Sequence, residues 1–399
     1  MKRNFSLLFV LVSLMAFAQI EEKKLDELIQ NTLKTFDVPG MSVGIIKDGK
    51  MVYAKGFGIN SLTTKQKMDE NTLVGIASNS KGFTGTALAM LADEGKLNFD
   101  DKVTKFIPEF RMYDPYVTQE ITVKDLITHR AGLGLGQGDL MFFPEGGNLT
   151  VNDIIHNVRY LKPEHSFRNT MDYNNIMFIV AGEVIKRVSG LSWAEFIEQR
   201  ILQPVGMKSS FGNYNRAKAA GVKNIIDAHA PVDGKVIQVP HDWNETADAA
   251  GGIISNITDM GIWADFLMNG FTTKDGKKLV SDKQIQQLWN LQIATPVALK
   301  NAYDSNFGGY GLGWFLTDVK GHKQVYHTGG LIGTVTQFTL IPDMKLGIIV
   351  LTNQQSGAAF STVTNTIKDA YLGIEDRNWL KTYGDRMAKM NADFEKGKK

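Results

Sequence analysis

The sequence of 399 residues contains no cysteine, and this absence excludes several kinds of chemistry. The chain has no thiol nucleophile and no cysteine metal ligand, and because it cannot form a disulfide its stability must come from an apolar core. Hydrophobic residues make up 43% of the sequence, which is enough for a sizeable core. Charged residues make up 22%, so the composition is that of an ordinary soluble protein.

The sequence also lacks an excess of charge of either sign. Its formal net charge is +2, and without Lys2 and Arg3, which lie in a predicted leader segment, basic and acidic residues are equal in number. Such a balance favours neither nucleic acid nor an acidic membrane surface as a partner. We therefore expect no nucleic-acid partner.

Long apolar runs are missing as well. Residues 7–14 form a short apolar segment behind two basic residues, and Ala16-Phe17-Ala18 is a typical cleavage pattern before Gln19. We expect residues 1–18 to be a signal peptide, so that the mature protein is periplasmic or secreted and has no membrane span. An uncleaved N-terminal anchor is the alternative.

The most informative stretch that is present is Ser78-Asn79-Ser80-Lys81. It opens a segment in which apolar residues recur at helical spacing until about Gly95. Ser78 is therefore expected at a helix N-terminus, where free N–H groups and the helix dipole favour a developing oxyanion. Lys81 follows one turn later, and a lysine whose pKa is lowered by burial could take the proton of the serine hydroxyl. The alternative is that Ser78 only caps the helix and that Lys81 is exposed.

Hydrophobic periodicity predicts one antiparallel sheet built from both ends of the chain. Residues 22–36 are expected to form an amphipathic helix, and 41–46 and 51–56 to form two strands joined by a turn at Asp48-Gly49. From 78 to about 290 the patterns are mostly helical, and strand patterns return after them. The late candidates are strands at 310–315, 324–327, 335–341 and 346–352 and a helix at about 359–371. The fold class is therefore α/β (α+β): an antiparallel sheet flanked by N- and C-terminal helices, with an inserted, mostly helical lobe.

The same patterns predict the domain organisation. One domain is expected over residues 19–375, with a sheet lobe at 19–77 plus 300–375 and a helical lobe at 78–299. A site between two such lobes is where pockets usually form. The tail at 376–399 carries an apolar stripe at helical spacing and is expected to dock on the body as a helix, with a partner or linker helix as the alternative. The apolar positions of this stripe are Trp379, Tyr383, Met387, Met390 and Phe394.

Two further short motifs carry polar chemistry. Tyr173-Asn174-Asn175 precedes a helical pattern, so a phenol and a carboxamide are expected side by side at a loop-to-helix junction. His327-Thr328-Gly329-Gly330 ends a predicted strand, and its glycines allow a backbone to approach a ligand closely.

The order Ser78-x-x-Lys81, Tyr173-x-Asn175, His327-Thr328-Gly329 resembles the serine β-lactamase and penicillin-binding-protein superfamily. The nearer likeness is to its class C branch, which holds class C β-lactamases, DD-carboxypeptidases, D-aminopeptidases and related esterases. Supporting matches run along most of the chain, at 126–133, 203–207, 250–255 and 310–314. The resemblance implies a β-lactamase/DD-peptidase-like fold and a serine hydrolase that needs no cofactor or metal.

The resemblance also implies a role for each motif residue. Ser78 would be the acylated nucleophile, and Lys81 and Tyr173 would move its proton to the leaving group, with Tyr173 kept ionisable by neighbouring cationic charge. Asn175 would hold the substrate carbonyl and help to orient Lys81. The backbone N–H groups of Ser78 and Gly330 would form the oxyanion hole, and Thr328 and Gly329 would border the bound substrate.

His327, which the resemblance also places among the catalytic residues, departs from the lysine that many β-lactamases carry in the third motif. A histidine is charged only part of the time near neutral pH, so it suits a substrate carboxylate less well. This favours small esters, or amides and peptides of D-amino acids, as substrates. A β-lactamase or DD-carboxypeptidase, and a non-catalytic penicillin-binding sensor, are the alternatives. The oligomeric state is not predicted.

Other residues are weaker candidates. His129 is expected to be structural, and Glu164-His165 to occupy a loop. Tyr310 and Trp314 are expected either to line the acyl pocket or to pack in the core. The remaining histidines show no metal-ligand spacing. Substrate choice is expected to depend on the loops around Tyr173, 139–150 and 212–248.

Overall fold

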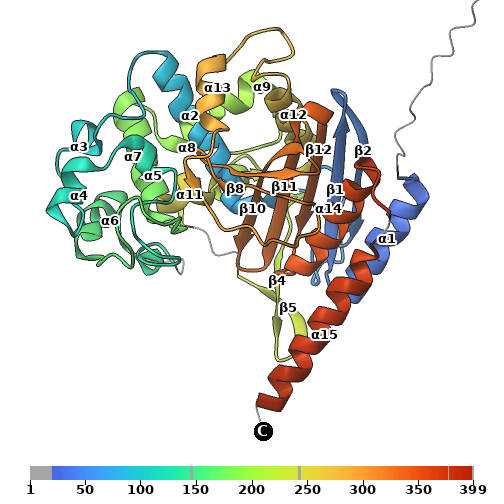
Figure 1. The fold of residues 1–399 in the computed structure, drawn as a ribbon. Helices are drawn as coiled ribbons and strands as arrows, with labels where there is room; N and C mark the ends of the chain where they lie inside the picture. The colour runs from blue at the N-terminus through green and yellow to red at the C-terminus, as the bar shows by residue number, and fades with distance from the viewer. Residues whose placement is uncertain (1–19, 144–146, 241–243, 376, 398–399) are drawn as a thin grey trace, which may run out of the picture.

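The computed structural model describes residues 20–143, 147–240, 244–375 and 377–397. An eight-stranded antiparallel sheet, in the order β2-β1-β12-β11-β10-β9-β8-β7, forms one layer of the fold (Figure 1). Its strands are β1 (Gly40–Lys47), β2 (Lys50–Gly58), β7 (Ile293–Ala294), β8 (Gly308–Tyr310), β9 (Phe315–Val319), β10 (His322–Leu331), β11 (Thr334–Ile341) and β12 (Leu346–Thr352). The early hairpin and the late strands therefore share one sheet, which confirms the predicted fold class. The predicted signal peptide at 1–18 lies outside the described residues.

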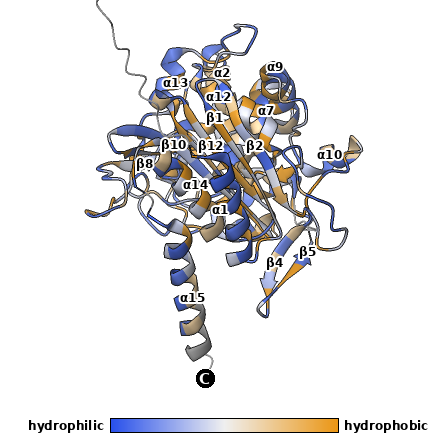
Figure 2. Cartoon of the chain, turned by 90° about the vertical axis from the view of Figure 1, so that its right-hand side faces the viewer, coloured by the Kyte–Doolittle hydropathy of each residue, from blue (hydrophilic) through white to orange (hydrophobic). Residues whose placement is uncertain are grey.

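Helices cover both faces of this sheet. α1 (Glu22–Thr35) and α14 (Gly357–Tyr371) pack on one face, and α12 (Ile257–Met268) packs on β1 and β12 from the other. Along β12, Ile348 and Val350 face the first pair of helices, whereas Ile349 and Leu351 face α12. Because both faces are buried here, β12 is apolar up to its last residue, and Figure 2 shows hydrophobic colouring along this central part of the sheet.

The turn between β1 and β2 has the conformation that its sequence predicts. Asp48 and Gly49 both have a positive φ, of 51° and 76°. Two such residues make the two-residue turn whose twist matches that of antiparallel strands, and Asp-Gly adopts it readily.

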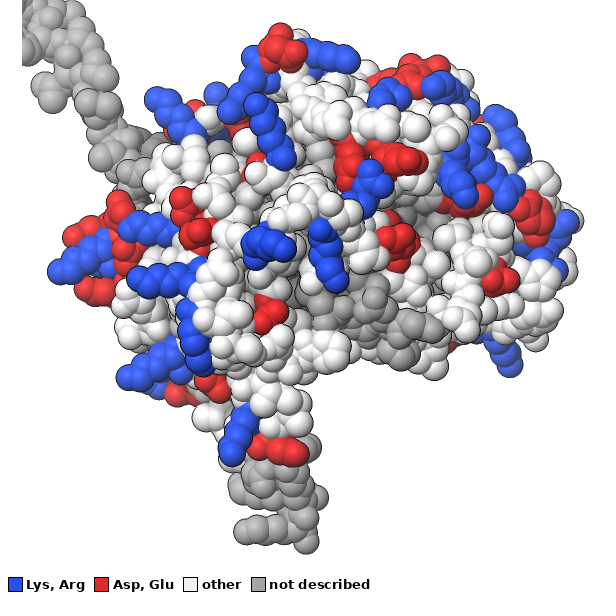
Figure 3. All heavy atoms as spheres, turned by 180° about the vertical axis from the view of Figure 1, so that it is seen from behind, with Lys and Arg blue, Asp and Glu red and all other residues white. Residues whose placement is uncertain are grey.

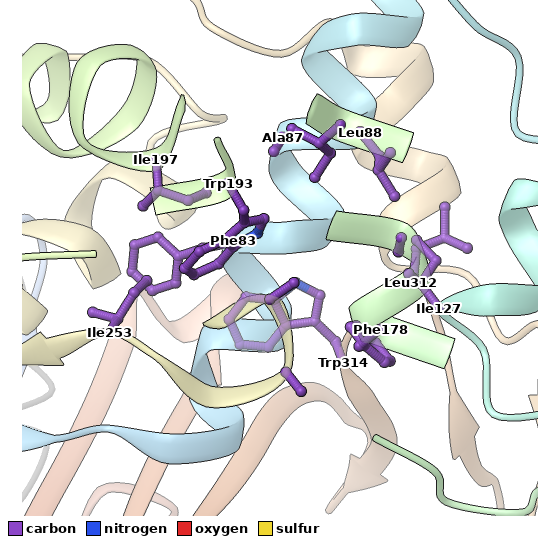
Figure 4. Close-up of a cluster of buried hydrophobic side chains, with 14 of the residues drawn as sticks. Phe83, Ala87, Leu88, Ile127, Phe178, Trp193, Ile197, Ile253, Leu312 and Trp314 are labelled. Atoms are coloured by element: carbon purple, nitrogen blue, oxygen red, sulfur yellow. The ribbon is translucent and has the colours of Figure 1, made fainter. Parts of the chain in front are cut away.

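The central element of the second layer is α2 (Ser80–Asp93). Every side chain from Ser80 to Leu91 is buried, so the helix is enclosed on all sides instead of burying a single stripe. Figure 4 shows Phe83, Ala87 and Leu88 among apolar side chains from several other elements. A Cβ added to Gly82 would lie 2.2 Å from the Trp314 ring, so the glycine permits this close approach.

The remaining elements surround α2 and the edge of the sheet. The longer helices are α7 (Ile176–Ser189), α6 (Val151–Asn157), α13 (Asp282–Leu288), α4 (Pro115–Glu120), α10 (Tyr214–Ala219) and α8 (Trp193–Ile197). The shorter helices are α3 (Val103–Phe106), α5 (Val123–Leu126), α9 (Gln203–Val205), α11 (Asp248–Gly251) and the 3-10 turn η1 (Ala77–Asn79). Two small sheets pair β3 (Val74–Gly75) with β6 (Ile254–Ser255) and β4 (Ala228–Val232) with β5 (Lys235–Val239).

The structure corrects two details of the predicted layout. The predicted strand at 310–315 is the junction of two strands, β8 and β9, because Gly313 has a φ of 86° and reverses the chain between them. The predicted boundary between the helical lobe and the sheet lobe at residue 299 also differs from the structure. α12 and β7 both precede this residue, yet α12 covers the sheet and β7 extends its edge.

The tail forms α15 (Trp379–Gly397), whose first part packs on α1 and α14 (Figure 1). Trp379 donates a hydrogen bond to Asp369 at 2.7 Å, and Tyr383 and Met387 join the apolar cluster beneath the sheet. The side chain of Phe394 lies outside the described residues. Within the described chain, no helix has the length and apolar character needed to cross a membrane. Lys and Arg are mixed with Asp and Glu over the face shown in Figure 3.

Candidate active site

Ser78 lies in η1, the single 3-10 turn that leads directly into α2. The preceding Ala77 has a φ of 50°, a conformation that L-residues other than glycine seldom adopt. Neighbouring hydrogen bonds hold this turn from two directions. Asn79 donates to Thr336 Oγ1 of β11 at 2.8 Å, and Ser80 Oγ accepts from the backbone N–H of Ile253 at 3.1 Å.

Lys81 is buried next to Ser78. Its Nζ lies 2.9 Å from Ser78 Oγ, 2.8 Å from Asn175 Oδ1 and 2.7 Å from the carbonyl oxygen of Ala250. Burial lowers the pKa of Lys81 to about 7, and the negative charge of Asp139 partly opposes this shift.

The three partners of Lys81 fit its neutral form. A neutral amine has two N–H groups and one lone pair, and the oxygens of Asn175 and Ala250 can only accept hydrogen bonds. In the neutral form the two N–H groups point to these two oxygens and the lone pair is left for the hydroxyl proton of Ser78, whereas in the charged form all three N–H groups donate. This geometry prepares Ser78 for deprotonation.

Tyr173 also forms a hydrogen bond with the Ser78 side chain, and its ring centroid lies 5.0 Å from Lys81 Nζ. Burial raises the pKa of Tyr173 above its ordinary value, although the bond to Ser78 partly offsets the increase. The expectation that nearby cationic charge keeps Tyr173 ionisable is therefore wrong. Tyr173 is a neutral phenol at rest, because desolvation of its hydroxyl and the charge of Asp139 both disfavour a phenolate.

His129 holds the loop that carries Tyr173. Its Nδ1 accepts a hydrogen bond from the backbone N–H of Asn174 at 3.1 Å, and its carbonyl oxygen accepts one from Asp172 at 2.7 Å. The rings of His129 and Tyr173 lie 4.1 Å apart. Burial keeps the pKa of His129 well below its usual range. This agrees with the structural role expected from the sequence.

Asn175 connects Lys81 to a carboxylate that the sequence motifs do not identify. Its Nδ2 donates to Asp139 Oδ2 at 3.0 Å, while its Oδ1 accepts from Lys81. Burial raises the pKa of Asp139 above its ordinary value. From the sequence, Asp139 is only the first residue of a loop expected to affect substrate choice, and no local pattern distinguishes it from other loop carboxylates.

His327 is buried and both of its ring nitrogens have partners. Nδ1 lies 2.6 Å from the carbonyl oxygen of Thr328, and Nε2 lies 2.9 Å from the hydroxyl of Tyr310. Burial lowers the pKa of His327 to about 3, and Lys81 contributes to the decrease. The expectation of a partly charged histidine near neutral pH is therefore wrong. The neutral ring donates through Nδ1 and accepts the Tyr310 hydroxyl at Nε2, so it supports the end of β10 from within the protein.

The two glycines of the third motif have different surroundings. A Cβ on Gly329 would lie 2.2 Å from the carbonyl oxygen of Ile76 and 2.4 Å from Thr336 Oγ1, so this glycine lets β10 lie against the segment that carries Ser78. A Cβ on Gly330 would meet nothing within 4 Å, because Gly330 faces open space.

Ser78 and Gly330 open onto a cavity of about 310 Å³. Its described lining residues are Ser78, Asp139, Phe142, Phe143, Asn175, Asn244, Ala247, Ala250, Gly251, Gly330, Leu331, Ile332 and Gln355. Two of the three loops expected to affect substrate choice, 139–150 and 212–248, thus contribute to its wall. Lys81, Tyr173 and His327 lie outside this lining, as do Thr328 and Gly329, and Lys81 and Tyr173 reach Ser78 from within the protein.

Tyr310 and Trp314 are both buried, and neither is among the described residues that line the cavity. Trp314 packs against α2, and Tyr310 supports His327. Among the described residues, no group of three or more His, Asp or Glu side chains is placed to hold a metal ion.

Comparison with known proteins identifies relatives that resemble this chain in fold and sequence. A solved structure of an octameric penicillin-binding protein homologue from Pyrococcus abyssi superimposes with a TM-score of 0.75 and 28% identity, over 88% of this chain and 77% of that one. An unguisins hydrolase from Aspergillus campestris is 27% identical over 90% of this chain and 67% of its own length. Protein flp from Staphylococcus aureus is 28% identical over 84% of this chain, and the match spans 64% of that protein.

A family model described as Beta-lactamase matches residues 25–372, nearly the whole described chain. The resemblance seen in the three sequence motifs is thereby confirmed. The chain belongs to the beta-lactamase family.

Proposed function

We propose that the protein is an exported serine hydrolase that cleaves small esters, or amides and peptides of D-amino acids, through an acyl-enzyme on Ser78. The observation that carries the proposal is the position of Lys81 Nζ, which lies 2.9 Å from Ser78 Oγ while its two other partners are oxygens that can only accept, so that the neutral amine directs its lone pair at the Ser78 hydroxyl. A buried amine with a pKa of about 7 is a suitable general base near neutral pH.

Acylation then follows from the positions of the side chains. Neutral Lys81 takes the Ser78 proton as Oγ attacks the substrate carbonyl carbon, and the carbonyl oxygen becomes an oxyanion held by the N–H groups of Ser78 and Gly330. When the intermediate collapses, the bond to the leaving group breaks and the Tyr173 phenol gives its proton to that group. Lys81 returns a proton to Tyr173, so both are neutral again.

Deacylation uses the same groups with water as the nucleophile. Water gives one proton to the Lys81–Tyr173 pair and adds to the ester carbonyl of the acyl-enzyme. The intermediate then releases the acid, and Ser78 Oγ regains its proton. Asn175 keeps Lys81 in place throughout, because its amide is fixed between Lys81 and Asp139.

A side-by-side hydrolysis assay tests the proposal. Wild type and Ser78→Ala are offered a 4-nitrophenyl short-chain ester, a chromogenic cephalosporin and a D-alanyl anilide, with Ser166→Ala, an exposed serine outside the cavity, as the matched control. We expect ester or D-alanyl turnover in wild type and in Ser166→Ala, and its loss in Ser78→Ala. Full activity in Ser78→Ala would contradict the mechanism. A mature N-terminus at Gln19 would support export.

The similarity to a penicillin-binding protein homologue suggests a second candidate function, namely action on β-lactams or cell-wall peptides. Against it, the described lining of the cavity offers no cationic side chain for a substrate carboxylate, and His327 is neutral. Cephalosporin turnover that disappears in Ser78→Ala would favour this function. A single labelling of Ser78 that never reverses would favour a sensor instead.

A further inference from the structure

We propose that Asp139 determines substrate specificity by binding a positively charged amino group next to the scissile carbonyl, so that the site prefers amino-acid esters and amides with a free amine. This inference rests on the proposed function, and it names the substrate class of the same site.

The hydrogen bonds of Asp139 leave one carboxylate oxygen without a partner. Oδ2 accepts from Asn175 Nδ2 at 3.0 Å, whereas Oδ1 is buried and has no hydrogen-bond partner in the described structure. A buried carboxylate oxygen without a donor is unfavourable, and an ammonium group supplies both a donor and the opposite charge. Lys81 does not fill this role, since its hydrogen bonds go to Ser78, Asn175 and Ala250.

The backbone fixes this carboxylate in place. Gly138 has a φ of 89°, and a Cβ there would come within 2.8 Å of the Ile176 side chain. Asp139 begins the short 3-10 turn η2 (Asp139–Met141) immediately after this glycine. The carboxylate therefore sits against the start of α7, where Asn175 precedes Ile176, instead of moving freely in a loop.

The charge distribution of the cavity favours a cation. Among its described lining residues, Asp139 alone carries a formal charge, and Phe142, Phe143, Leu331 and Ile332 supply apolar surface. An anionic substrate would find no counter-ion among them, whereas an ammonium group would find Asp139 in surroundings that strengthen the attraction.

The connection to Ser78 places the amine near the reacting carbonyl. Hydrogen bonds of 2.8 to 3.0 Å link Ser78 to Lys81, Lys81 to Asn175 and Asn175 to Asp139, and Ser78, Asn175 and Asp139 all line the same cavity. The nitrogen of an amino group on the carbon next to the carbonyl is two bonds away from the reacting carbonyl carbon. It therefore lies within reach of the wall that carries Asp139.

A competition experiment tests the inference without requiring turnover of the amine. Alaninamide, in both configurations, and propionamide differ by one amino group, which is protonated at pH 7 because an α-amino group has a pKa of roughly 8. Each is measured as an inhibitor of 4-nitrophenyl acetate hydrolysis by wild type, Asp139→Asn and Asp233→Asn. Asp139→Asn keeps an oxygen for Asn175 but removes the charge, and Asp233 is an exposed carboxylate in the β4–β5 turn.

We expect wild type and Asp233→Asn to bind alaninamide more tightly than propionamide, by roughly ten- to a hundred-fold, as for a hydrogen bond to a charged group. In Asp139→Asn this preference should disappear. Equal inhibition by both amides in wild type would overturn the inference. So would an equal loss of inhibition by both amides in Asp139→Asn, and either result would leave Asp139 as a positioning residue for Asn175. If acetate hydrolysis persists in Ser78→Ala, the proposed function itself fails, which is a distinct result.

Discussion

At the scale of single residues, the protonation state of Lys81 decides whether Ser78 can react. The amine is buried, and its partners at Asn175 and Ala250 are oxygens that accept but do not donate. Burial favours the neutral form and lowers the pKa of Lys81, whereas the carboxylate of Asp139 favours the charged form and raises it. Asp139 is therefore expected to tune the base as well as to line the cavity.

This balance predicts how activity depends on pH. Only neutral Lys81 accepts the serine proton, so kcat/KM for an uncharged ester should be low in acid, rise through about pH 7 and level off above it. In Asp139→Asn the pKa of Lys81 should fall, because the charge that raises it is gone, and the acidic limb should move to lower pH. Asp233→Asn serves as the control. A limb that stays in place or moves to higher pH would contradict this account.

At the scale of secondary-structure elements, the site depends on how closely β10 approaches η1. Gly329 has no room for a side chain against Ile76 and Thr336, whereas the next residue, Gly330, faces open space. The two glycines are adjacent in one motif, and the sequence cannot distinguish them, because the difference arises from packing between distant segments.

The two glycines therefore provide a matched pair of substitutions. Gly329→Ala should lower the free energy of unfolding by about 1–3 kcal/mol, as overpacking does, and should reduce esterase activity by displacing Ser78. Gly330→Ala should change the free energy of unfolding by less than about 0.5 kcal/mol, since its Cβ meets nothing. Urea denaturation measures both. Equal stability of the two variants would show that β10 does not press on η1.

At the scale of the whole molecule, the sequence predicted the single sheet and the motif residues better than the loops between them. The early hairpin and the late strands were recognisable because β1 and β12 are apolar and end at turn residues. The predicted strand at 310–315 was wrong because Gly313 reverses the chain, and an isolated glycine does not reveal its φ.

The charge states of the site residues depended on tertiary structure. The neutral state of Tyr173 and of His327 follows from burial by elements far away in the sequence, which no local motif records. Asp139 was missed as a site residue for the same reason, because its contact with Asn175 joins segments 36 residues apart.

Trapping the acyl-enzyme tests the central claim most directly. The protein is mixed with a 4-nitrophenyl ester, quenched in acid within the first turnovers, and analysed by intact mass spectrometry and peptide mapping. The account predicts one added acyl group, located on Ser78, and none in Ser78→Ala. An acyl group on another residue, or unchanged labelling in Ser78→Ala, would contradict the assignment of Ser78 as the nucleophile.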